Sequence, residues 1–378
     1  MALLAAVLLF ALFTFTGLGQ KALCLGGGAL CDSRAITAPG PDLTSPPPSA
    51  AIAPGTPAAT TPGTPTPGAS TTGTPSARPG TATGKPPAKP ARPGTGDAKP
   101  PAPRNCASPR ACGYPDASTT GPRVATLTPQ STGNASIRTD GTVIRGWDIK
   151  GSLDIYANNV TVIDSRVTST NWWGINLRPG YHGLRILHTT ITTLPGKGPN
   201  NGGADYAVSN MGTSSIEIGY CDISVFGDAL SMGQGYIHDN YVHDITPFRN
   251  LDGEWQHTNA VISNGGGKGK LIIRHNTLLN PTPVEQGASA SIGLFADSAP
   301  VTGTIVDDNW LAGGSYALYA GAKNSSGIEV TDNVFSTEYF TFSGHYGAVA
   351  HWDPKGKGNI WRGNRMTDGT PVVPAPEG

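Results

Sequence analysis

The chain has 378 residues, with 51 glycines and 34 prolines, and its 26 lysines and arginines balance 26 aspartates and glutamates. A formal net charge of zero, without a basic stripe, excludes the electrostatic footprint that nucleic-acid-binding proteins carry. None of the five cysteines lies in a CxxC pair or in a Cys/His spacing typical of zinc, so we assign no metal site from them.

Residues 1–23 begin the chain with an apolar segment. Residues 2–18 are apolar apart from Thr14, Thr16 and Gly17, and this run is at the lower limit of length for crossing a bilayer. The nearest cation, Lys21, follows the run instead of preceding it, so a secretory signal peptide and an uncleaved membrane anchor both fit. Either one predicts a protein that is secreted or tethered to the cell surface.

Residues 24–104 form a segment rich in proline, threonine, glycine and alanine. Nineteen prolines fall between Ile36 and Asn105, and such a composition has too little apolar surface to offset the entropy of ordering. We predict a disordered linker that holds the following domain away from the envelope.

Residues 105–374 are expected to form one folded domain. Cys106 and Cys112 bracket a short, turn-prone loop that a disulfide could close in an oxidising compartment. Residues 106–138 precede the repeats of this domain and are expected to cap the exposed end of the fold. Cys221 lies within the repeats and is expected to be a small buried side chain.

One short pattern recurs through this domain. An apolar residue is followed five positions later by a second one, and these anchors recur every 18 to 36 residues. Such intervals are typical of stacked supersecondary units instead of one compact core. The pairs are Ile144/Ile149, Val162/Val167, Ile186/Ile191, Ile218/Ile223, Ile237/Val242, Ile273/Leu278, Val306/Leu311, Val330/Phe335 and Trp361/Met366.

The third position after each anchor carries a sharper signal. It reads Trp147, Ser165, Thr189 and Cys221, and then Asn240, Asn276, Asn309, Asn333 and Asn364. Amides one strand spacing apart, about 4.8 Å, can hydrogen-bond along a stack. With a second short apolar strand between repeats, this predicts an all-β fold, a right-handed parallel β-helix of about nine coils. A β-sandwich or a propeller is the alternative, but neither predicts an asparagine column.

Two segments carry a family resemblance. They are Cys-Gly-Tyr-Pro-Asp-Ala-Ser-Thr-Thr-Gly-Pro at 112–122 and Thr-Asp-Gly-Thr-Val-Ile at 139–144. The chain resembles exported right-handed parallel β-helix proteins of actinobacterial type, within the pectin-lyase-like superfamily, over about residues 106–370. The resemblance implies this fold, and it transfers no activity of the superfamily residue by residue. Similar sequences often read His-Thr-Asp where this chain has His257, Thr258 and Asn259, so an amide replaces a carboxylate here.

The candidate site lies on long loops between neighbouring coils, because the interior of a β-helix is filled and function falls to loops and one sheet face. Aligning the short strands puts Tyr206, Asp228 and Asn259 in one column, with Asp205 one residue earlier in its coil. The loop before Asn259 adds polar and aromatic groups at the same edge, namely Arg249, Glu254, Trp255 and His257. Such a concentration predicts a carbohydrate cleft.

β-Elimination from a uronate polymer is the first reaction that fits. It needs a base beside the carboxyl group of the substrate and a group that neutralises the developing charge. His257 would be the base near neutral pH. Asn259 or an arginine, Arg249 or Arg274, would polarise the substrate carboxyl.

Hydrolysis is the second reaction, with Asp205 and Asp228 as the acid/base pair. Asp205, Asp228 and Glu254 could alternatively hold a Ca²⁺ ion through their oxygens, although no loop carries a calcium-binding motif. We rank elimination ahead of hydrolysis on the sequence.

A non-catalytic function is the alternative, because the same polar groups can serve turns and stacks. Trp172 and Trp173 are candidates for stacking on sugar rings. The domain would then be a cell-surface protein that binds a polysaccharide or cell-wall glycan. Whether it is an enzyme stays open, and in either case we expect a monomer.

Overall fold

The computed structural model describes residues 106–130, 133–210, 214–322 and 324–375. The segments predicted at 1–23 and 24–104 lie outside these residues. All described residues belong to one unit, Ala102–Gly378. Within the described ranges the helices are two short 3-10 turns, η1 (Arg110–Cys112) and η2 (Val284–Gln286), and none is long and apolar enough to cross a membrane.

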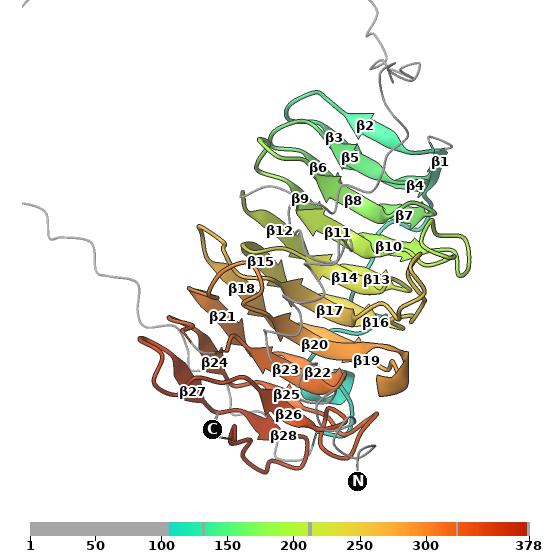
Figure 1. Ribbon diagram of the computed structural model, residues 1–378. Coiled ribbons are helices and arrows are strands. Elements are labelled where there is room, and N and C mark those ends of the chain that lie inside the picture. Colours follow the sequence, from blue (N-terminus) through green and yellow to red (C-terminus); the bar gives the residue numbers. More distant parts are fainter. Residues whose placement is uncertain (1–105, 131–132, 211–213, 323, 376–378) are drawn as a thin grey trace, which may run out of the picture. The chain divides into compact units, whose positions relative to one another are not determined.

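Short strands stack coil upon coil into parallel sheets (Figure 1), and each strand pairs with the strands one coil before and one coil after it. Because consecutive strands of the chain belong to different sheets, the backbone winds in one direction, and parallel crossovers of this kind are right-handed. The predicted right-handed parallel β-helix is confirmed.

The described residues form three sheets. Sheet A contains β1 (Thr128–Gln130), β4 (Trp147–Lys150), β7 (Arg166–Ser169), β10 (Thr190–Thr193), β13 (Asp222–Ser224), β16 (Tyr241–His243), β19 (Thr277–Asn280), β22 (Trp310–Gly313), β25 (Val334–Phe335) and β28 (Arg365–Met366). Sheet B contains β2 (Ala135–Ile137), β5 (Leu153–Ile155), β8 (Trp173–Leu177), β11 (Tyr206–Asn210), β14 (Asp228–Ser231), β17 (Thr258–Ser263), β20 (Ala288–Leu294), β23 (Tyr316–Ala320) and β26 (Gly347–Ala350). Sheet C contains β3 (Val143–Arg145), β6 (Thr161–Ile163), β9 (Arg185–Leu187), β12 (Ile216–Gly219), β15 (Gly235–His238), β18 (Leu271–Arg274), β21 (Thr304–Asp307), β24 (Glu329–Thr331) and β27 (Ile360–Arg362).

The apolar anchors fill the interior as the repeat predicts. In sheet C, Ile237 is in register with Ile273, and Ile273 with Val306. In sheet A the second members of the pairs stack likewise, for example Leu278 on Leu311. These side chains are fully buried, so the core is a file of aliphatic groups along the coil axis, and burial of that file stabilises the stack.

The asparagine column is confirmed at the turn between sheets C and A. Each side-chain Nδ2 donates to the Oδ1 of the asparagine one coil later at 2.9 Å, from Asn240 through Asn276, Asn309 and Asn333 to Asn364. Each Oδ1 also accepts the backbone N–H of the asparagine before it, at 2.9–3.1 Å. The ladder therefore satisfies buried turn amides that would otherwise lack partners.

A left-handed backbone position precedes the ladder in every coil. It is occupied by Gly146, Asp164, His188, Tyr220, Asp239, His275, Asp308, Asp332 and Gly363, with φ between 46° and 71°. Aspartate and glycine tolerate this conformation better than most residues. The turn geometry thus explains both the acidic residues before the ladder and the bend from sheet C into sheet A.

Residues 106–123 form a strap along the outside of the coils instead of the predicted cap. Cys106 N donates to Thr367 O in the last coil at 2.9 Å, while the Arg123 guanidinium makes two 2.8 Å bonds to Asp164 near the first coil. Between them, the Thr277 Oγ1 donates to Pro115 O at 2.6 Å. The chain therefore runs along the axis against the order of the coils.

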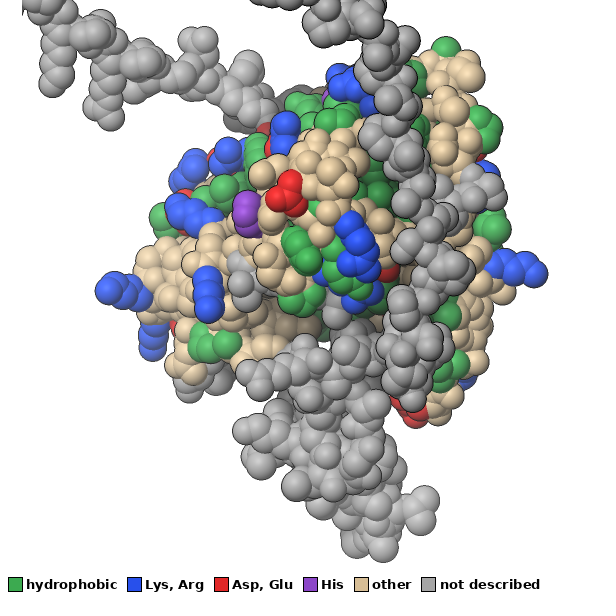
Figure 2. All heavy atoms as spheres, turned by 90° about the horizontal axis from the view of Figure 1, so that it is seen from above, with side chains coloured by type: hydrophobic (Ala, Val, Ile, Leu, Met, Phe, Trp, Pro, Cys, Tyr) green, Lys and Arg blue, Asp and Glu red, His purple; other side chains and the backbone are tan. Residues whose placement is uncertain are grey.

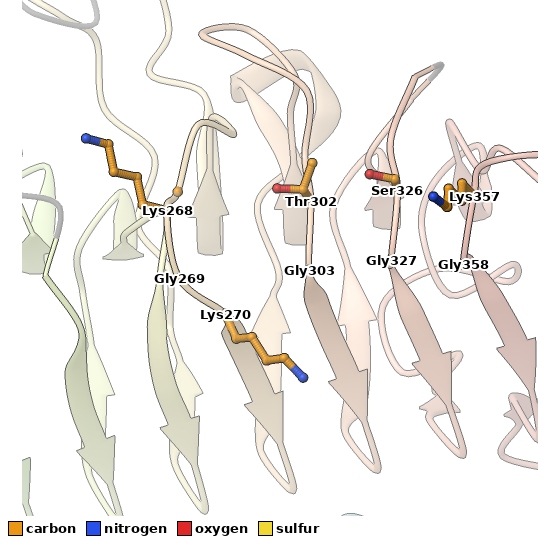
Figure 3. Close-up of a pocket in the computed structure, with 10 residues that line it drawn as sticks. Lys268, Gly269, Lys270, Thr302, Gly303, Ser326, Gly327, Lys357 and Gly358 are labelled. Atoms are coloured by element: carbon orange, nitrogen blue, oxygen red, sulfur yellow. The ribbon is translucent and has the colours of Figure 1, made fainter.

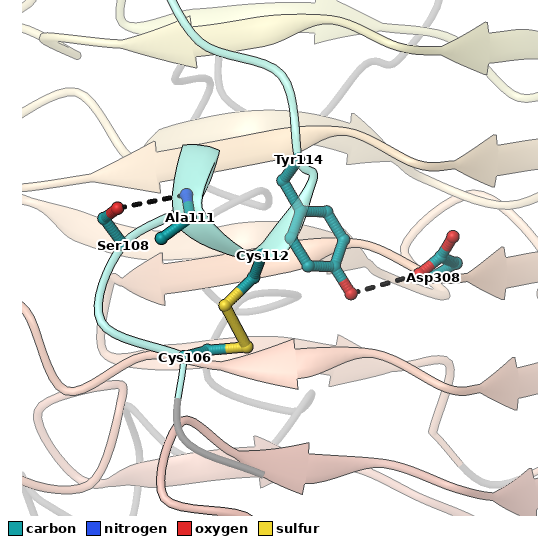
Figure 4. The surroundings of a disulfide bond; sticks show 6 residues. All are labelled: Cys106, Ser108, Ala111, Cys112, Tyr114 and Asp308. Carbon is teal, nitrogen blue, oxygen red and sulfur yellow. Dashed lines mark hydrogen bonds between the residues drawn. A yellow bond between two sulfur atoms is a disulfide. The ribbon is translucent and has the colours of Figure 1, made fainter. Parts of the chain in front are cut away.

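The strap begins with a disulfide between Cys106 and Cys112 (Figure 4), the bond that the short loop made possible. Tyr114 donates to Asp308 Oδ1 at 3.0 Å and packs against Trp310. With Cys106, these aromatic side chains form a small second apolar cluster over sheet A. Burial of this outer apolar surface fixes the strap.

The cap prediction is correct only for the end of its segment. β1 pairs with β4 and β2 with β5, so residues 128–130 and 135–137 cover the edge of the first complete coil. The part before them was wrongly assigned to the cap, because the apolar groups around Tyr114 match a strip of sheet A near the other end. Cys221 is buried and free, as predicted.

His243 on β16 lies between two carboxylates. Its Nε2 is 2.8 Å from Asp222 Oδ1 and its Nδ1 is 2.8 Å from Asp244 Oδ2. Burial lowers the pKa of His243, but the bonds and charges of Asp222 and Asp244 outweigh it and raise the pKa above 6.5. Both partners only accept, so the doubly protonated ring fits the site.

We expect an NMR titration of the ring protons to give a pKa for His243 above the usual value, and Asp222→Asn to lower it. Because the folded pKa is raised, the stability that His243 contributes is full below about pH 6.5 and is lost as pH rises through the folded value. Asp244→Asn is the matched control and should lower the pKa less, since its side chain is 75% exposed against 25% for Asp222. Equal shifts, or none, would contradict the assignment.

Candidate functional site

Sheet B aligns the predicted column. Asp228 of β14 is in register with Tyr206 of β11 and with Asn259 of β17, and Tyr206 with Trp173 of β8. The column faces outward, because a Cβ on Gly293 would lie 2.9 Å from Asn259 Oδ1, and Gly293 alternates with core residues on its strand.

Two loops cover this column, residues 194–205 and residues 247–257. A Cβ on Gly227 would meet the Phe248 ring at 2.7 Å and Gln256 Cγ at 3.2 Å, and a Cβ on Gly203 would overlap the same ring. The glycines therefore let Phe248, itself 8% exposed, pack flat on the backbone ahead of β11 and β14. The loop 247–257 is held down over the carboxylates as a result.

Asp228 is the most strongly perturbed carboxyl of the column. It is 3% exposed, and its oxygens accept from Asn259 Nδ2 at 2.8 Å and from Gln256 Nε2 at 3.1 Å. Burial raises the pKa of Asp228 to about 8, the amide of Asn259 opposes the rise, and the charge of Asp205 adds to it. Asp228 therefore keeps its proton at neutral pH.

Asp205 lies one coil before Asp228, and its backbone carbonyl accepts the Asp228 N–H at 2.7 Å. Burial raises the pKa of Asp205 to about 6, although Asn200 Nδ2 donates to its Oδ1 at 3.2 Å and opposes the rise. Burial and the charges of both aspartates hold the pKa of Tyr206 well above its usual value. The two carboxyls thus hold different protonation states near neutral pH.

Asn200 joins the two loops and is a site residue that the sequence reasoning missed. It is 6% exposed, and its Nδ2 also donates to Asn250 Oδ1 at 2.8 Å. Its Oδ1 accepts the Leu251 N–H at 2.9 Å. An amide in a long, glycine-rich loop carries no pattern that distinguishes it, so only its burial reveals the role.

Arg249 and Trp255 form the outer part of the covering loop. The guanidinium lies 4.5 Å from the centre of the indole ring, and Arg249 Nη1 donates to Gly253 O at 2.7 Å. Both residues line a cavity of about 510 Å³ on the connections from sheet A to sheet B, with Pro195, Gly202 and Val225 among its walls. The stacked pair forms a flat polar and aromatic wall there.

His257 and Glu254 are not brought to the aspartates. Both side chains are exposed, and among the described residues no hydrogen bond or ion pair joins either of them to Asp205 or Asp228. The charge of His257 acts instead on Asp297. Burial raises the pKa of Asp297, and the charges of His257 and His351 oppose that rise. Glu254 and His257 therefore lie on an exposed loop, whereas Asn259 lies on the buried strand that follows it.

Trp173 does not form an open surface on which a sugar ring could stack. Its ring is 9% exposed, and the Arg178 guanidinium lies 4.9 Å from its centre. Arg178 is held by Asp154 Oδ1 at 2.9 Å. The indole is therefore nearly buried, with a guanidinium over one of its faces.

Within the described part of the chain, no group of three or more His, Cys, Asp or Glu side chains is arranged to hold a metal ion. The view in Figure 2 shows lysine and arginine side chains spread among polar and apolar ones, without a continuous basic face on that side.

No protein-family model, no curated protein and no solved structure matches this chain. The roles of the site residues therefore rest on their geometry.

Proposed function

We propose that the β-helix domain acts on a polysaccharide by acid/base hydrolysis at the Asp205 and Asp228 pair. The observation that carries this proposal is two carboxyls on adjacent coils with pKa values raised to about 6 and about 8. Between these values one is ionised and the other protonated, which is the state a glycosidase requires of its base and its acid. The β-helix fold is compatible with carbohydrate-active proteins in general.

The other residues of the column have supporting roles in this proposal. Gln256 and Asn259 orient Asp228 through its two oxygens, and Asn200 orients Asp205. Arg249 and Trp255 line the neighbouring cavity, where a sugar ring and a carboxylate would find an aromatic face and a cation. These contacts favour an acidic polysaccharide as substrate.

Hydrolysis now ranks ahead of elimination, which reverses the order drawn from the sequence. Elimination needs a base beside the reacting carbon, and the His257 side chain is exposed and makes no hydrogen bond to either aspartate among the described residues. Its electrostatic neighbour is Asp297. Asp205 and Asp228, in contrast, are close enough for the charge of one to raise the pKa of the other.

A non-catalytic glycan-binding protein is the second candidate. It is favoured by the burial of Asp228, which is 3% exposed and accepts two amide hydrogen bonds. A carboxyl satisfied in this way can serve the loops alone. A substrate would reach it only if the loop 247–257 moved.

Export and membership in the pectin-lyase-like superfamily remain part of the proposal. The Cys106–Cys112 disulfide supports an oxidising compartment. The signal peptide or anchor at 1–23 and the linker at 24–104 lie outside the described residues. A glycan of the cell wall or surroundings is the partner that this location would offer to a monomer.

Hydrolysis is tested by incubating the full-length protein with acidic and neutral polysaccharides and measuring reducing ends. We expect activity with an optimum between about pH 6 and about pH 8, the two raised pKa values. Asp228→Asn and Asp205→Asn should each lower kcat by about 10²-fold, the loss of a general acid or base.

Asp252→Asn is the matched control, because it makes the same carboxyl-to-amide change at the exposed tip of the loop 247–257, and it should leave kcat unchanged. Unsaturated products that disappear in His257→Ala would favour elimination. Binding of a glycan without any cleavage would favour the second candidate.

A further inference from the structure

A second hollow lies at the turns that lead from sheet B into sheet C, away from the connections that carry the aspartates. Its volume is about 570 Å³. It extends over the starts of β18, β21, β24 and β27, four consecutive strands of sheet C (Figure 3). The lining residues are Gly267, Lys268, Gly269, Lys270, Thr302, Gly303, Ser326, Gly327, Lys357 and Gly358. We call this hollow the lysine groove.

Glycines form the floor of the lysine groove. The sheet C register places Gly303, Gly327 and Gly358 one above another, with φ values of 60°, 63° and 77°. A Cβ at Gly303 would meet nothing within 4 Å, so the groove is open to solvent there. L-residues with side chains rarely adopt this positive φ, so glycines occupy these positions. Because a glycine has no side chain, the three glycines leave a trough parallel to the coil axis.

Lysines form its ends. Lys268 and Lys270 extend from the first of the four coils and Lys357 from the last, and all three are exposed. No acidic side chain lines the groove, and within the described ranges none of the three makes an ion pair with an aspartate or glutamate. The positive charge of the groove therefore has no internal counter-charge and attracts an anion from outside.

We propose that the lysine groove binds an acidic polysaccharide laid along the coil axis. Coils repeat about every 4.8 Å, so the lysines at the two ends are roughly 14 Å apart along the axis. This span matches a short run of pyranose residues, so the carboxylates of one uronate chain reach the lysines at both ends. Thr302 and Ser326, between the lysines, offer hydroxyl groups to the sugar hydroxyls.

The lining selects this partner over other polymers. No aromatic residue lines the groove, so neither the bases of a single-stranded nucleic acid nor the apolar face of a neutral sugar would find a ring to stack on. Lysine ammonium groups bind carboxylates as point charges on flexible stems. Charge with hydroxyl groups, and without aromatic surface, fits an acidic sugar chain.

Titration calorimetry of the full-length protein with a uniform oligogalacturonate tests the proposal. We expect binding that weakens as salt is raised from about 0.05 M to about 0.5 M, because exposed charges are screened. The triple variant Lys268→Ala, Lys270→Ala and Lys357→Ala should bind about tenfold more weakly, which is about 1.4 kcal/mol. Circular dichroism checks that the variant keeps its fold.

The matched control removes three exposed lysines that do not line the groove, with Lys150→Ala, Lys197→Ala and Lys355→Ala. It should keep the affinity of the wild type, which separates the groove from net charge. Equal losses in the two triple variants, or no loss in the first, would overturn the proposal. So would equal affinity for a neutral galactan, for polyphosphate or for oligothymidylate. Neither triple variant changes a residue that the proposed hydrolysis uses, so hydrolysis at Asp228 is scored separately by the release of reducing ends.

Discussion

Asn276→Leu is expected to lower the free energy of unfolding by about 3–4 kcal/mol, the sum of several unmade buried hydrogen bonds. The side-chain Nδ2 donates to Ile237 O, Arg274 O and Asn309 Oδ1 at 2.9–3.1 Å. Its Oδ1 accepts from both nitrogens of Asn240 at 2.9 Å. Leucine has a similar volume but offers neither donor nor acceptor, so each of these buried partners loses a hydrogen bond. Denaturant unfolding of both proteins measures the difference.

The same substitution at the end of the ladder is the control. Asn364 also accepts from both nitrogens of its neighbour, Asn333, but donates only to Val330 O, at 2.8 Å. It is 4% exposed, whereas Asn276 is fully buried. Asn364→Leu should therefore destabilise by about half as much. Equal costs at the two positions would show that leucine packing, and not the amide ladder, sets the stability.

Asp228→Asn is expected to make the protein more stable at alkaline pH. The folded pKa of Asp228, about 8, is raised above the ordinary value of 3.8, so the folded state binds more protons between these values. Stability is then full below about pH 4 and falls as pH rises through about pH 8. From about pH 5 to about pH 9 the wild type should lose roughly 3–4 kcal/mol that the variant does not lose.

The amide can be accommodated at this position. In the wild type, Gln256 and Asn259 both donate to the Asp228 carboxyl. The new carboxamide has an oxygen that accepts and a nitrogen that donates, so one of these two neighbouring amides must turn its oxygen towards that nitrogen. Asn259 Oδ1 has no hydrogen-bond partner among the described residues, and turning that amide gives up nothing. The measurement is the free energy of unfolding of both proteins at the two pH values. A constant difference between them would mean that Asp228 is ionised throughout.

The repeat could be found from the sequence because its physical requirements are local and periodic. Each coil needs an apolar side chain facing inward on two strands and an amide at the turn between them. Ile273, Asn276 and Leu278 carry that pattern within six residues, and it recurs on the next coil at Val306, Asn309 and Leu311. The pairing register of strands in neighbouring coils could also be predicted, because stacking identical turns leaves little freedom in pairing.

The strap could not be found in this way. It depends on Tyr114 and Cys106 meeting Trp310 and Val334, residues some two hundred positions away, and no period links them. A segment before the first coil can cover the end of the fold or its side with similar loss of apolar exposure. The matching apolar strip decides, and it exists only after the coils have stacked.

The sequence by itself determined the coil, its register and the column of Tyr206, Asp228 and Asn259, because a strand alternates its faces and a stack repeats them. Only the tertiary structure decided the chemistry proposed for that column. Burial raises the pKa of Asp228, and the exposed His257 makes no hydrogen bond to it among the described residues. A pKa depends on the groups and solvent around a carboxyl in space, and those are contributed by loops whose paths have no period.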